Sequence, residues 1–248
     1  GKGSALTTPA ITSPLIVNFR PALSGDFNAG IGRTAHGEEY LLKTNPAEAL
    51  AEFVGSKICA IAGVPCGTPA VVNFKGQEIF GSKLEHGLSA TPKTYPDIEQ
   101  IIAKCTNPTV FSSVLAVDVA LGNPDRHWQN WLYQPQASGG ILVRAIDFSQ
   151  GIPSTCPPIP IADMKVHNTG LEWARWPKLG VKYDPNSART AIAQMTSLNA
   201  KWLADVMEPL PSAWTTSAQA TALVSWWSTD WTVRLNETEQ FLDAGAWQ

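Results

Sequence analysis

The chain has 248 residues and a mass of 26.7 kDa, which suits one domain or two tightly packed lobes with a substantial core. Its formal net charge is −3 and its pI about 5.8, and Lys and Arg are scattered without a basic run. The electrostatic signature of a nucleic-acid-binding protein is therefore absent, and we expect neither DNA nor RNA as a primary partner.

The four cysteines are too irregularly spaced for a zinc site and too few for the disulfide framework of a secreted chain. They are Cys59, Cys66, Cys105 and Cys156, and we expect buried free thiols. No apolar run reaches the roughly 18 residues of a membrane-spanning helix, and the opening GKGSALTTPA lacks the apolar region of a signal peptide. The expectation is a cytoplasmic protein without a membrane partner.

The first part of the chain is predicted to form an antiparallel sheet. Runs rich in β-forming residues at 13–19 (SPLIVNF) and 38–44 (EEYLLKT) indicate two strands. Between them, 20–34 (RPALSGDFNAGIGRT) is rich in small residues and is predicted to be a loop.

A well-defined helix follows these strands. Asn45 is predicted as its N-cap, Pro46 as its first residue and Gly63 as its C-cap, with apolar residues at helical spacing between them. Two further strands, 69–74 (PAVVNF) and 77–80 (QEIF), are predicted to pair around the turn Lys75-Gly76.

The remainder is predicted to be mostly helical around one small hairpin. A short helix is expected at 97–105, and 109–121 is apolar nearly all round, as in a helix buried between other elements. Gly122 ends that second helix. A hairpin over 130–146 then delivers Asp147 at its far end.

The C-terminal third has weaker signals. Residues 151–182 are rich in Pro and Trp and have no assignment, whereas Asp184-Pro185 restarts a helix with one apolar stripe from Ile192 to Val206. One or two more helices are expected over 216–243. Eight of the ten tryptophans follow Asn168, which indicates a helical core or, less economically, a stacking platform for a ligand.

One short polar segment points to chemistry. Residues 122–130 read GNPDRHWQN, and Asp147 of AIDFS follows seventeen positions after Asn130. Amide and carboxylate oxygens such as those of Asn130 and Asp147 are the ligands that hold a magnesium ion carrying nucleotide phosphates. Asp125, five residues before Asn130, is placed to orient a hydroxyl and accept its proton.

Two upstream residues complete the pattern. Lys43 ends a strand after a glycine-bearing loop, and Glu52 lies on the following helix. A strand lysine held by a helix carboxylate is the arrangement that grips the α- and β-phosphates in kinases.

In order and spacing, these residues resemble those of the HipA-like kinases, which share their catalytic core with phosphoinositide kinases. The resemblance covers roughly residues 14–150 and rests on three stretches: YLLK ending at Lys43, Glu52 followed by Gly63-Val64-Pro65, and GNPDRHWQN with AIDFS. It implies an α+β, two-lobed protein-kinase-like fold. The β-rich N-lobe is expected over 1–85 and the mainly helical C-lobe over 86–248, with ATP between them.

The resemblance also implies roles for single residues. Lys43 would contact phosphate and Glu52 would hold Lys43. Asp125 would be the catalytic base, and Asn130 and Asp147 the magnesium ligands. His127 would order the catalytic loop rather than transfer protons. By position, the remaining nucleotide contacts are expected at the hinge and the glycine loop, at Phe80, Ser82, Leu84, Ser24, Gly25 and Gly30.

The chain departs from the kinase pattern at three points. Ser149 occupies the third position of the metal motif, where many kinases have Gly, and LSGDFNAGIG lacks the GxGxxG spacing. The chain is also much shorter than full-length HipA toxins, so toxin activity is not expected from the resemblance, and an antitoxin-type partner is left open without support from the sequence.

The function expected from this pattern is an ATP- and Mg-dependent phosphotransferase, with a protein Ser/Thr kinase as the preferred interpretation. By their position near the glycine loop, Thr34 and Ser24 are candidate autophosphorylation sites. Alternatives are a kinase of a small molecule or lipid headgroup, transfer of AMP instead of phosphate, and a kinase-shaped binding module that transfers nothing. A metallophosphoesterase is disfavoured, because the four histidines form no metal-binding pair. Neither the acceptor nor the oligomeric state can be derived from the sequence.

Overall fold

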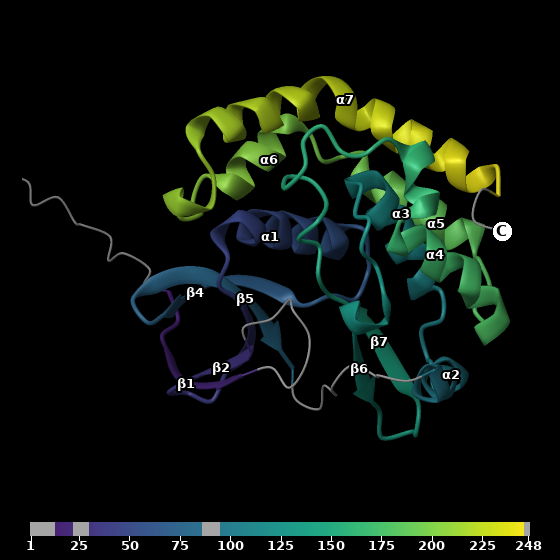
Figure 1. Cartoon of the computed structure of the whole chain (residues 1–248), viewed down its shortest axis with the longest axis horizontal. Coiled ribbons are helices and arrows are strands. Elements are labelled where there is room, and N and C mark those ends of the chain that lie inside the picture. The colour runs from purple at the N-terminus through teal and green to yellow at the C-terminus, as the bar shows by residue number, and fades with distance from the viewer. Residues whose placement is uncertain (1–12, 22–29, 86–94, 246–248) are drawn as a thin grey trace, which may run out of the picture.

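The computed structural model describes residues 13–21, 30–85 and 95–245 (Figure 1). The fold is α+β, with a β-sheet in the N-terminal region and helices in the C-terminal part. The sheet is antiparallel, in the order β1-β2-β3-β5-β4. Its strands are β1 (Ile16–Pro21), β2 (Gly30–Thr34), β3 (Glu39–Lys43), β4 (Thr68–Phe74) and β5 (Gln77–Leu84).

The prediction of a loop over 20–34 is wrong at both ends, because β1 extends to Pro21 and Gly30–Thr34 forms β2. The small residues of β2 have low β-propensity, so the sequence did not indicate a strand there. Pairing with β1 on one side and β3 on the other stabilises the strand. A side chain at Gly32 would lie 2.7 Å from Leu42 and 2.8 Å from Ile16. The small residue thus lets three strands pack over a shared core.

Helix α1 (Pro46–Ile61) confirms the capping prediction at its start. The Asn45 side chain accepts a hydrogen bond from the backbone N–H of Ala47 at 3.0 Å. The C-cap is Ala62, one residue earlier than predicted, and Gly63 follows with a left-handed φ of 78°. The predicted hairpin also forms, as β4 and β5 around Lys75 and Gly76.

The helical part surrounds α3 (Val110–Leu121), in which every residue except Ser113 is buried. Gly122 ends α3 in the left-handed conformation, as its position predicts. The hairpin of β6 (Trp131–Pro135) and β7 (Ile141–Ala145) lies beside α2 (Tyr95–Lys104), and both were expected (Figure 1).

The unassigned segment 151–182 forms the short helices η2 (Ile161–Val166), α4 (Asn168–Arg175) and η3 (Trp176–Leu179). The single apolar stripe predicted over 192–206 belongs to two helices, α5 (Pro185–Met195) and α6 (Ala200–Met207). The Asn199 side chain accepts from the backbone N–H of Trp202 at 2.9 Å and so starts a new helix. The chain ends in one long helix, α7 (Ser217–Asp243).

Tryptophan forms much of the helical core, as the more economical interpretation predicted. Trp176 lies stacked between Trp128 and Trp173, at ring-centroid distances of 4.8 and 5.1 Å. Trp227 and Trp231 form a second stack at 4.0 Å. All of these except Trp128 are buried.

The described thiols are free, but their burial differs from the expectation. Cys59 is buried, Cys66 and Cys105 are partly buried, and Cys156 is exposed. Within the described ranges, no helix combines the length and apolarity that a bilayer crossing requires.

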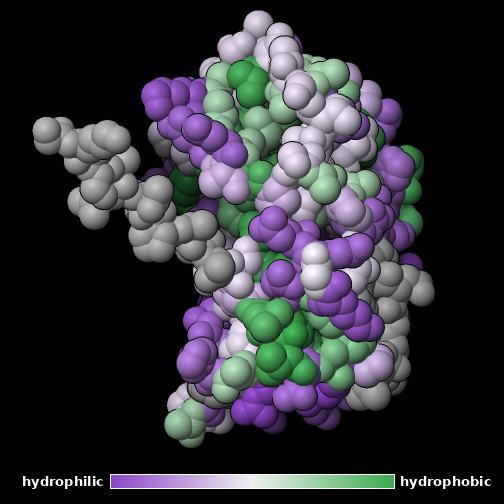
Figure 2. All heavy atoms as spheres, turned by 90° about the vertical axis from the view of Figure 1, so that its left-hand side faces the viewer, coloured by the Kyte–Doolittle hydropathy of each residue, from purple (hydrophilic) through white to green (hydrophobic). Residues whose placement is uncertain are grey.

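Apolar side chains also lie outside the core, at the edge of the sheet. Figure 2 shows them in the lower half of the face that contains the sheet. Leu15, Val17 and Phe19 are exposed in and just before β1, and the Phe19 ring contacts that of Phe74 at 5.0 Å.

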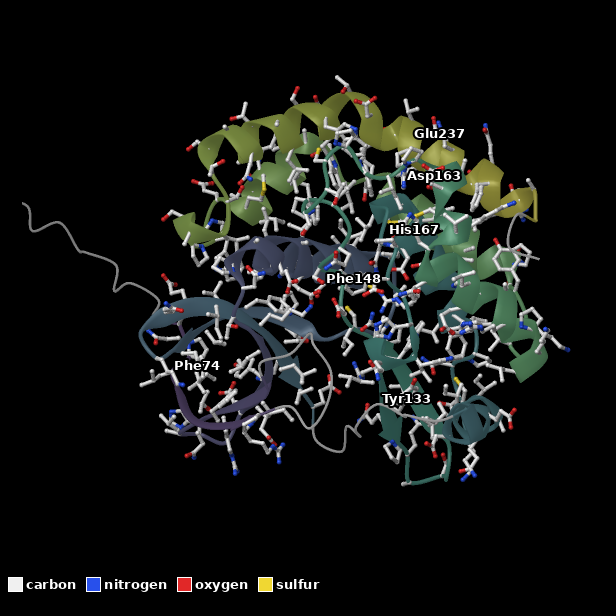
Figure 3. The ribbon with its side chains drawn as sticks, in the orientation of Figure 1. Phe74, Tyr133, Phe148, Asp163, His167 and Glu237 are labelled. Carbon is white, nitrogen blue, oxygen red and sulfur yellow. The ribbon has the colours of Figure 1, made fainter. Side chains whose placement is uncertain are left out.

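Helix α1 joins the two parts, because it packs on β4 and β5 on one side and on α3 on the other (Figure 1). Its closest approach is at Gly55, where an added Cβ would lie 2.5 Å from Cβ and 2.9 Å from Cγ of Phe148. Figure 3 shows Phe148 beside this helix. Gly55 thus brings α1 into direct contact with the residue after Asp147.

We predict that Gly55→Ala destabilises the protein by about 1–3 kcal/mol, because the new methyl group displaces Phe148. Glycine-to-alanine exchange inside a helix is otherwise stabilising, by about 0.5–1 kcal/mol, so the two effects have opposite signs. Urea denaturation measures the change, with the exposed Lys57→Ala on the same helix as control. A more stable Gly55→Ala variant would contradict the close contact.

Candidate functional site

A buried cluster of three charged side chains lies where the sheet meets the helical part. Lys43 ends β3, Glu52 is on α1, and Asp147 follows β7. The Lys43 ammonium Nζ lies 2.8 Å from Asp147 Oδ1 and 3.4 Å from Glu52 Oε1. All three are at least nine-tenths buried, so three distant segments converge on one desolvated site.

Burial and pairing act differently on these groups. Burial raises the pKa of Glu52 to about 8, an effect that Lys43 opposes and the Asp147 carboxylate reinforces. Burial also opposes ionisation of Asp147, but the nearby Lys43 lowers the pKa of this carboxyl below its usual value. The Lys43 ammonium lies closer to Asp147 than to Glu52. Its positive charge therefore stabilises the ionised form of Asp147 more strongly than that of Glu52.

The backbone at Asp147 is unusual, with a left-handed φ of 66° that non-glycine residues rarely adopt. The Ser149 hydroxyl donates to Asp147 Oδ1 at 2.8 Å, so the serine at the position of the usual glycine supports the carboxylate. Glu52 Oε1 accepts from the backbone N–H of Phe148 at 2.5 Å. Together, these contacts fix the orientation of Asp147.

Asp147 Oδ2, in contrast, is buried without a hydrogen-bond partner. A buried carboxylate oxygen that lacks a donor is costly. A proton on Glu52, whose carboxyl hydrogen-bonds Asp147, and a bound cation are the two ways to compensate it. The oxygen is of the type that magnesium prefers. On this observation, the residues present fit a bound cation.

Asn130 and Asp125 lie in the loop between α3 and β6. The Asn130 side-chain nitrogen donates to the backbone carbonyl of Asp125 at 2.6 Å. This hydrogen bond uses the amide nitrogen, so the amide oxygen of Asn130 is the atom that could face a metal ion. The backbone N–H of Ile146, the residue before Asp147, donates to the Asn130 carbonyl at 3.1 Å. The two predicted metal ligands therefore lie at the same end of the β6–β7 hairpin.

Arg126, inside the same loop, was missed as a site residue by the sequence interpretation. Its guanidinium is fully buried, with Nε 2.7 Å from Asp118 Oδ2 on α3. Nη1 donates to the carbonyls of Asn130, at 2.7 Å, and Ile146. Arg126 thus joins α3, the loop and both strands of the hairpin at its open end.

Two further residues that were missed hold the loop backbone. The Asn123 side chain donates to Asp118 Oδ1 at 2.9 Å and accepts from the backbone N–H of Asp125 at 3.3 Å. The Thr169 hydroxyl donates to the Asn123 carbonyl at 2.7 Å and accepts from the backbone N–H of Arg126 at 2.9 Å. Asp118, the one charged residue of the largely apolar helix α3, was the sequence signal, since a buried charge requires a partner.

His127 lies beside Asp125, with Nε2 3.7 Å from Asp125 Oδ2. Its Nδ1 accepts from the backbone N–H of Gln129 at 3.2 Å, which caps the short helix η1 (Trp128–Asn130). Burial lowers the pKa of His127 below its ordinary value. The neutral ring thus contacts the loop backbone, while its loop-ordering role remains a hypothesis.

The predicted adenine contacts are on β5, whose Phe80 pairs with Lys43 of β3. Phe80 and Ser82 are buried and line a cavity that also contains Lys43 and Asp147, whereas Leu84 is not among its lining residues. The cavity measures only about 10 Å³. A nucleotide therefore requires its walls to separate.

The remaining predicted residues belong to the glycine-loop region. Ser24 and Gly25 lie outside the described residues. Gly30 begins β2 opposite Leu42, the residue before Lys43. The Thr34 side chain is buried and accepts from the backbone N–H of Glu38 at 3.2 Å, so the geometry argues against autophosphorylation there.

The described residues contain no group of three or more His, Cys, Asp or Glu side chains that could hold a metal ion. A magnesium ion bound together with a nucleotide needs no such group, because phosphate oxygens and water complete its octahedral coordination. Asn130 and Asp147 are side chains of the type that would hold such an ion.

No protein-family model and no curated protein matches this sequence. Solved structures do match. The proinflammatory kinase CtkA of Helicobacter pylori superimposes with a TM-score of 0.59 and 12% identity, over 92% of this chain and 97% of that one. HipA of Shewanella oneidensis, in a toxin–antitoxin complex with HipB and operator DNA, gives a TM-score of 0.50 and 12% identity, over 84% of this chain and 59% of HipA.

The chain has the fold of these kinases. The predicted α+β, kinase-like architecture and its relationship to HipA are therefore confirmed at the level of fold. At 12% identity, the likeness does not extend to activity or substrate.

The raised pKa of Glu52 predicts a pH dependence of stability. The folded protein holds a proton on Glu52 up to about pH 8, whereas the unfolded chain loses it near 4.5. The folded state thus binds more protons between these values, and stability falls as pH rises through this window, by up to about 1.4 kcal/mol per pH unit.

Denaturation of wild type and Glu52→Gln between pH 5 and 8.5 tests this sign. Glutamine mimics the protonated carboxyl, so wild type should lose stability relative to the variant as pH rises. The depressed pKa of His127 acts in the opposite direction but is common to both proteins. A constant difference between wild type and variant across this range would show that Lys43 keeps Glu52 ionised in the folded protein.

Proposed function

We propose that the chain is an ATP- and magnesium-dependent phosphotransferase that acts on a hydroxyl group. The acceptor that we favour is a protein Ser or Thr. The observation that carries the proposal is the buried cluster of Lys43, Glu52 and Asp147, in which one carboxylate oxygen of Asp147 has no hydrogen-bond partner. The kinase-like fold of CtkA and HipA supports the same class of reaction.

In this proposal, Lys43 binds the α- and β-phosphates, and Glu52 and Asp147 fix its position. Asp147 Oδ2 and the Asn130 amide oxygen would hold Mg²⁺, which would neutralise charge on the phosphate oxygens. Adenine would lie along Phe80 and Ser82 once the cavity walls separate. Positioning and charge neutralisation then account for most of the catalysis.

Asp125 is proposed as the base that orients and deprotonates the acceptor. The acceptor O–H bond breaks as its proton passes to the carboxylate, and the oxygen forms a bond to the γ-phosphorus. The bond between that phosphorus and the β,γ-bridging oxygen breaks, releasing ADP. Attack on the α-phosphorus would transfer AMP instead, and product analysis separates the two reactions.

A second candidate function has one observation in its favour. The cavity of about 10 Å³ has no room for a nucleotide as it stands, as expected of a kinase-shaped binding module that transfers nothing. The presence of the four polar residues that a kinase requires favours the enzyme, because a kinase-shaped binding module commonly lacks at least one of them. These residues are Lys43, Asp125, Asn130 and Asp147.

Asp147→Ala and Asp147→Asn should each weaken binding of Mg-ATP by at least about tenfold, or about 1.4 kcal/mol, because a metal ligand is lost. Calorimetric titration of ATP with and without magnesium measures this effect. Asp163→Ala removes an exposed carboxylate and serves as control. Unchanged magnesium-dependent binding in both Asp147 variants would refute the assignment, and absence of binding to the wild type would favour the binding module.

Asp125→Asn should lower kcat by about 10²–10⁴, the usual contribution of a positioned general base, with little change in ATP affinity. Release of labelled phosphate or ADP from ATP under single-turnover conditions provides the rate. Activity close to that of the wild type would exclude Asp125 as the base.

A further inference from the structure

A hollow of about 330 Å³ lies beside Asp125, away from the cavity that contains Lys43 and Asp147. Its lining comes from the catalytic loop, from the segment after the metal motif and from the start of α4: Pro124, Asp125, Gln150, Val166, His167 and Asn168. Figure 3 labels His167 at the start of α4. The volume is in the range of small-ligand sites, so Asp125 has room for a substrate on one side.

Asn168 anchors Asp125 from the far wall of this hollow. Its side-chain nitrogen donates to Asp125 Oδ1 at 2.7 Å, across 43 positions of sequence. The backbone N–H of the next residue, Thr169, donates to the Pro124 carbonyl at 3.0 Å, so α4 is joined to the loop there. Asn168 holds Oδ1, so an incoming hydroxyl would approach Oδ2, which lies 3.7 Å from His127 Nε2.

The charges around the hollow restrict its ligand. Among the residues that the structure describes, the lining contains one carboxylate, two amides and one histidine, but neither Lys nor Arg. Lys165, next to Val166 in the chain, extends over the Phe241 ring at 6.0 Å. A phosphorylated headgroup would bring negative charge toward Asp125 without a lining cation to pair with it.

The rim supplies an apolar contact. Val166 is 74% exposed, a large apolar surface at the edge of a polar hollow. A side chain next to the acceptor residue of a peptide could bury it, at roughly 25 cal/mol per Å² of apolar surface removed from water. A small polar molecule confined to the hollow would leave it exposed.

We infer that this hollow is the acceptor site and takes an uncharged hydroxyl on a peptide segment with an apolar neighbour. In this assignment, Asn168 is a positioning residue for Asp125 and Val166 a specificity residue. The inference rests on the proposed phosphotransfer, which it deepens by favouring a Ser- or Thr-containing peptide over a phosphorylated lipid headgroup.

The test uses a serine- and threonine-centred peptide library with each flanking position fixed in turn, labelled ATP and the full chain. Wild type should prefer an apolar residue next to the acceptor. Val166→Asp should abolish that preference and raise the peptide KM at least fivefold, with Mg-ATP affinity unchanged. Leu171→Asp, at an exposed apolar position on α4, is the matched control.

Asn168→Ala should lower kcat about tenfold and leave the KM values for ATP and for the peptide unchanged, because Asp125 keeps its place but loses the donor that orients its carboxylate. A merely structural role would change KM and kcat together, so the split between kcat and KM distinguishes the two roles. Asn186→Ala, at an exposed asparagine of α5, is the control.

The outcomes separate the two proposals. No magnesium-dependent ATP binding by the wild type would defeat the proposed function itself. ATP turnover with transfer to inositol phospholipid vesicles and to no peptide would overturn the acceptor assignment alone. Peptide transfer that is identical in wild type, Val166→Asp and Asn168→Ala would also overturn it.

Discussion

The candidate site depends on the buried ion pair between Asp118 and Arg126. A guanidinium removed from water is tolerated only when its charge and its donors are satisfied, and here one carboxylate and two backbone carbonyls do so. Those carbonyls belong to Asn130, itself a proposed metal ligand, and to Ile146, the residue before the second proposed ligand, Asp147. Through this pair, the position of α3 in the core determines where the two proposed metal ligands lie.

The charges of the neighbouring cluster have a different balance. Lys43 faces two carboxylates, and burial keeps a proton on Glu52. Protonated Glu52, Lys43 and ionised Asp147 together carry no net charge, so the site by itself does not offset the charge of a nucleotide. A divalent cation would supply that compensation, which gives an electrostatic reason for the magnesium dependence proposed above.

Local sequence signals were sufficient for much of the fold and for part of the site. Asn45 and Pro46 define the start of α1, and Gly122 the end of α3, because caps act through nearest neighbours. Strand β2 was missed because its stability comes from two partner strands rather than its own glycine-rich sequence. The clustering of Lys43, Glu52 and Asp147 was anticipated through order, spacing and family resemblance.

The supporting contacts were beyond local signals. Thr169 binds a loop more than forty residues upstream, and Asn168 reaches Asp125 over a similar separation. Both come from a segment that had no assigned secondary structure, so no pattern connected them to the loop. Only the three-dimensional packing of α4 against the loop places them there.

Helix α7 has a consequence for the order in which the site can form. Its buried Arg234 donates to the carbonyls of Val119 at 2.8 Å and Ala120 at 3.2 Å, at the end of α3, and to that of Ile159 at 2.7 Å. A cation there also complements the negative end of the helix dipole. During synthesis, α3 and the catalytic loop emerge from the ribosome long before Arg234. The nascent chain therefore carries every proposed catalytic residue before it has the side chain that caps their supporting helix, and the finished site has to await translation of α7.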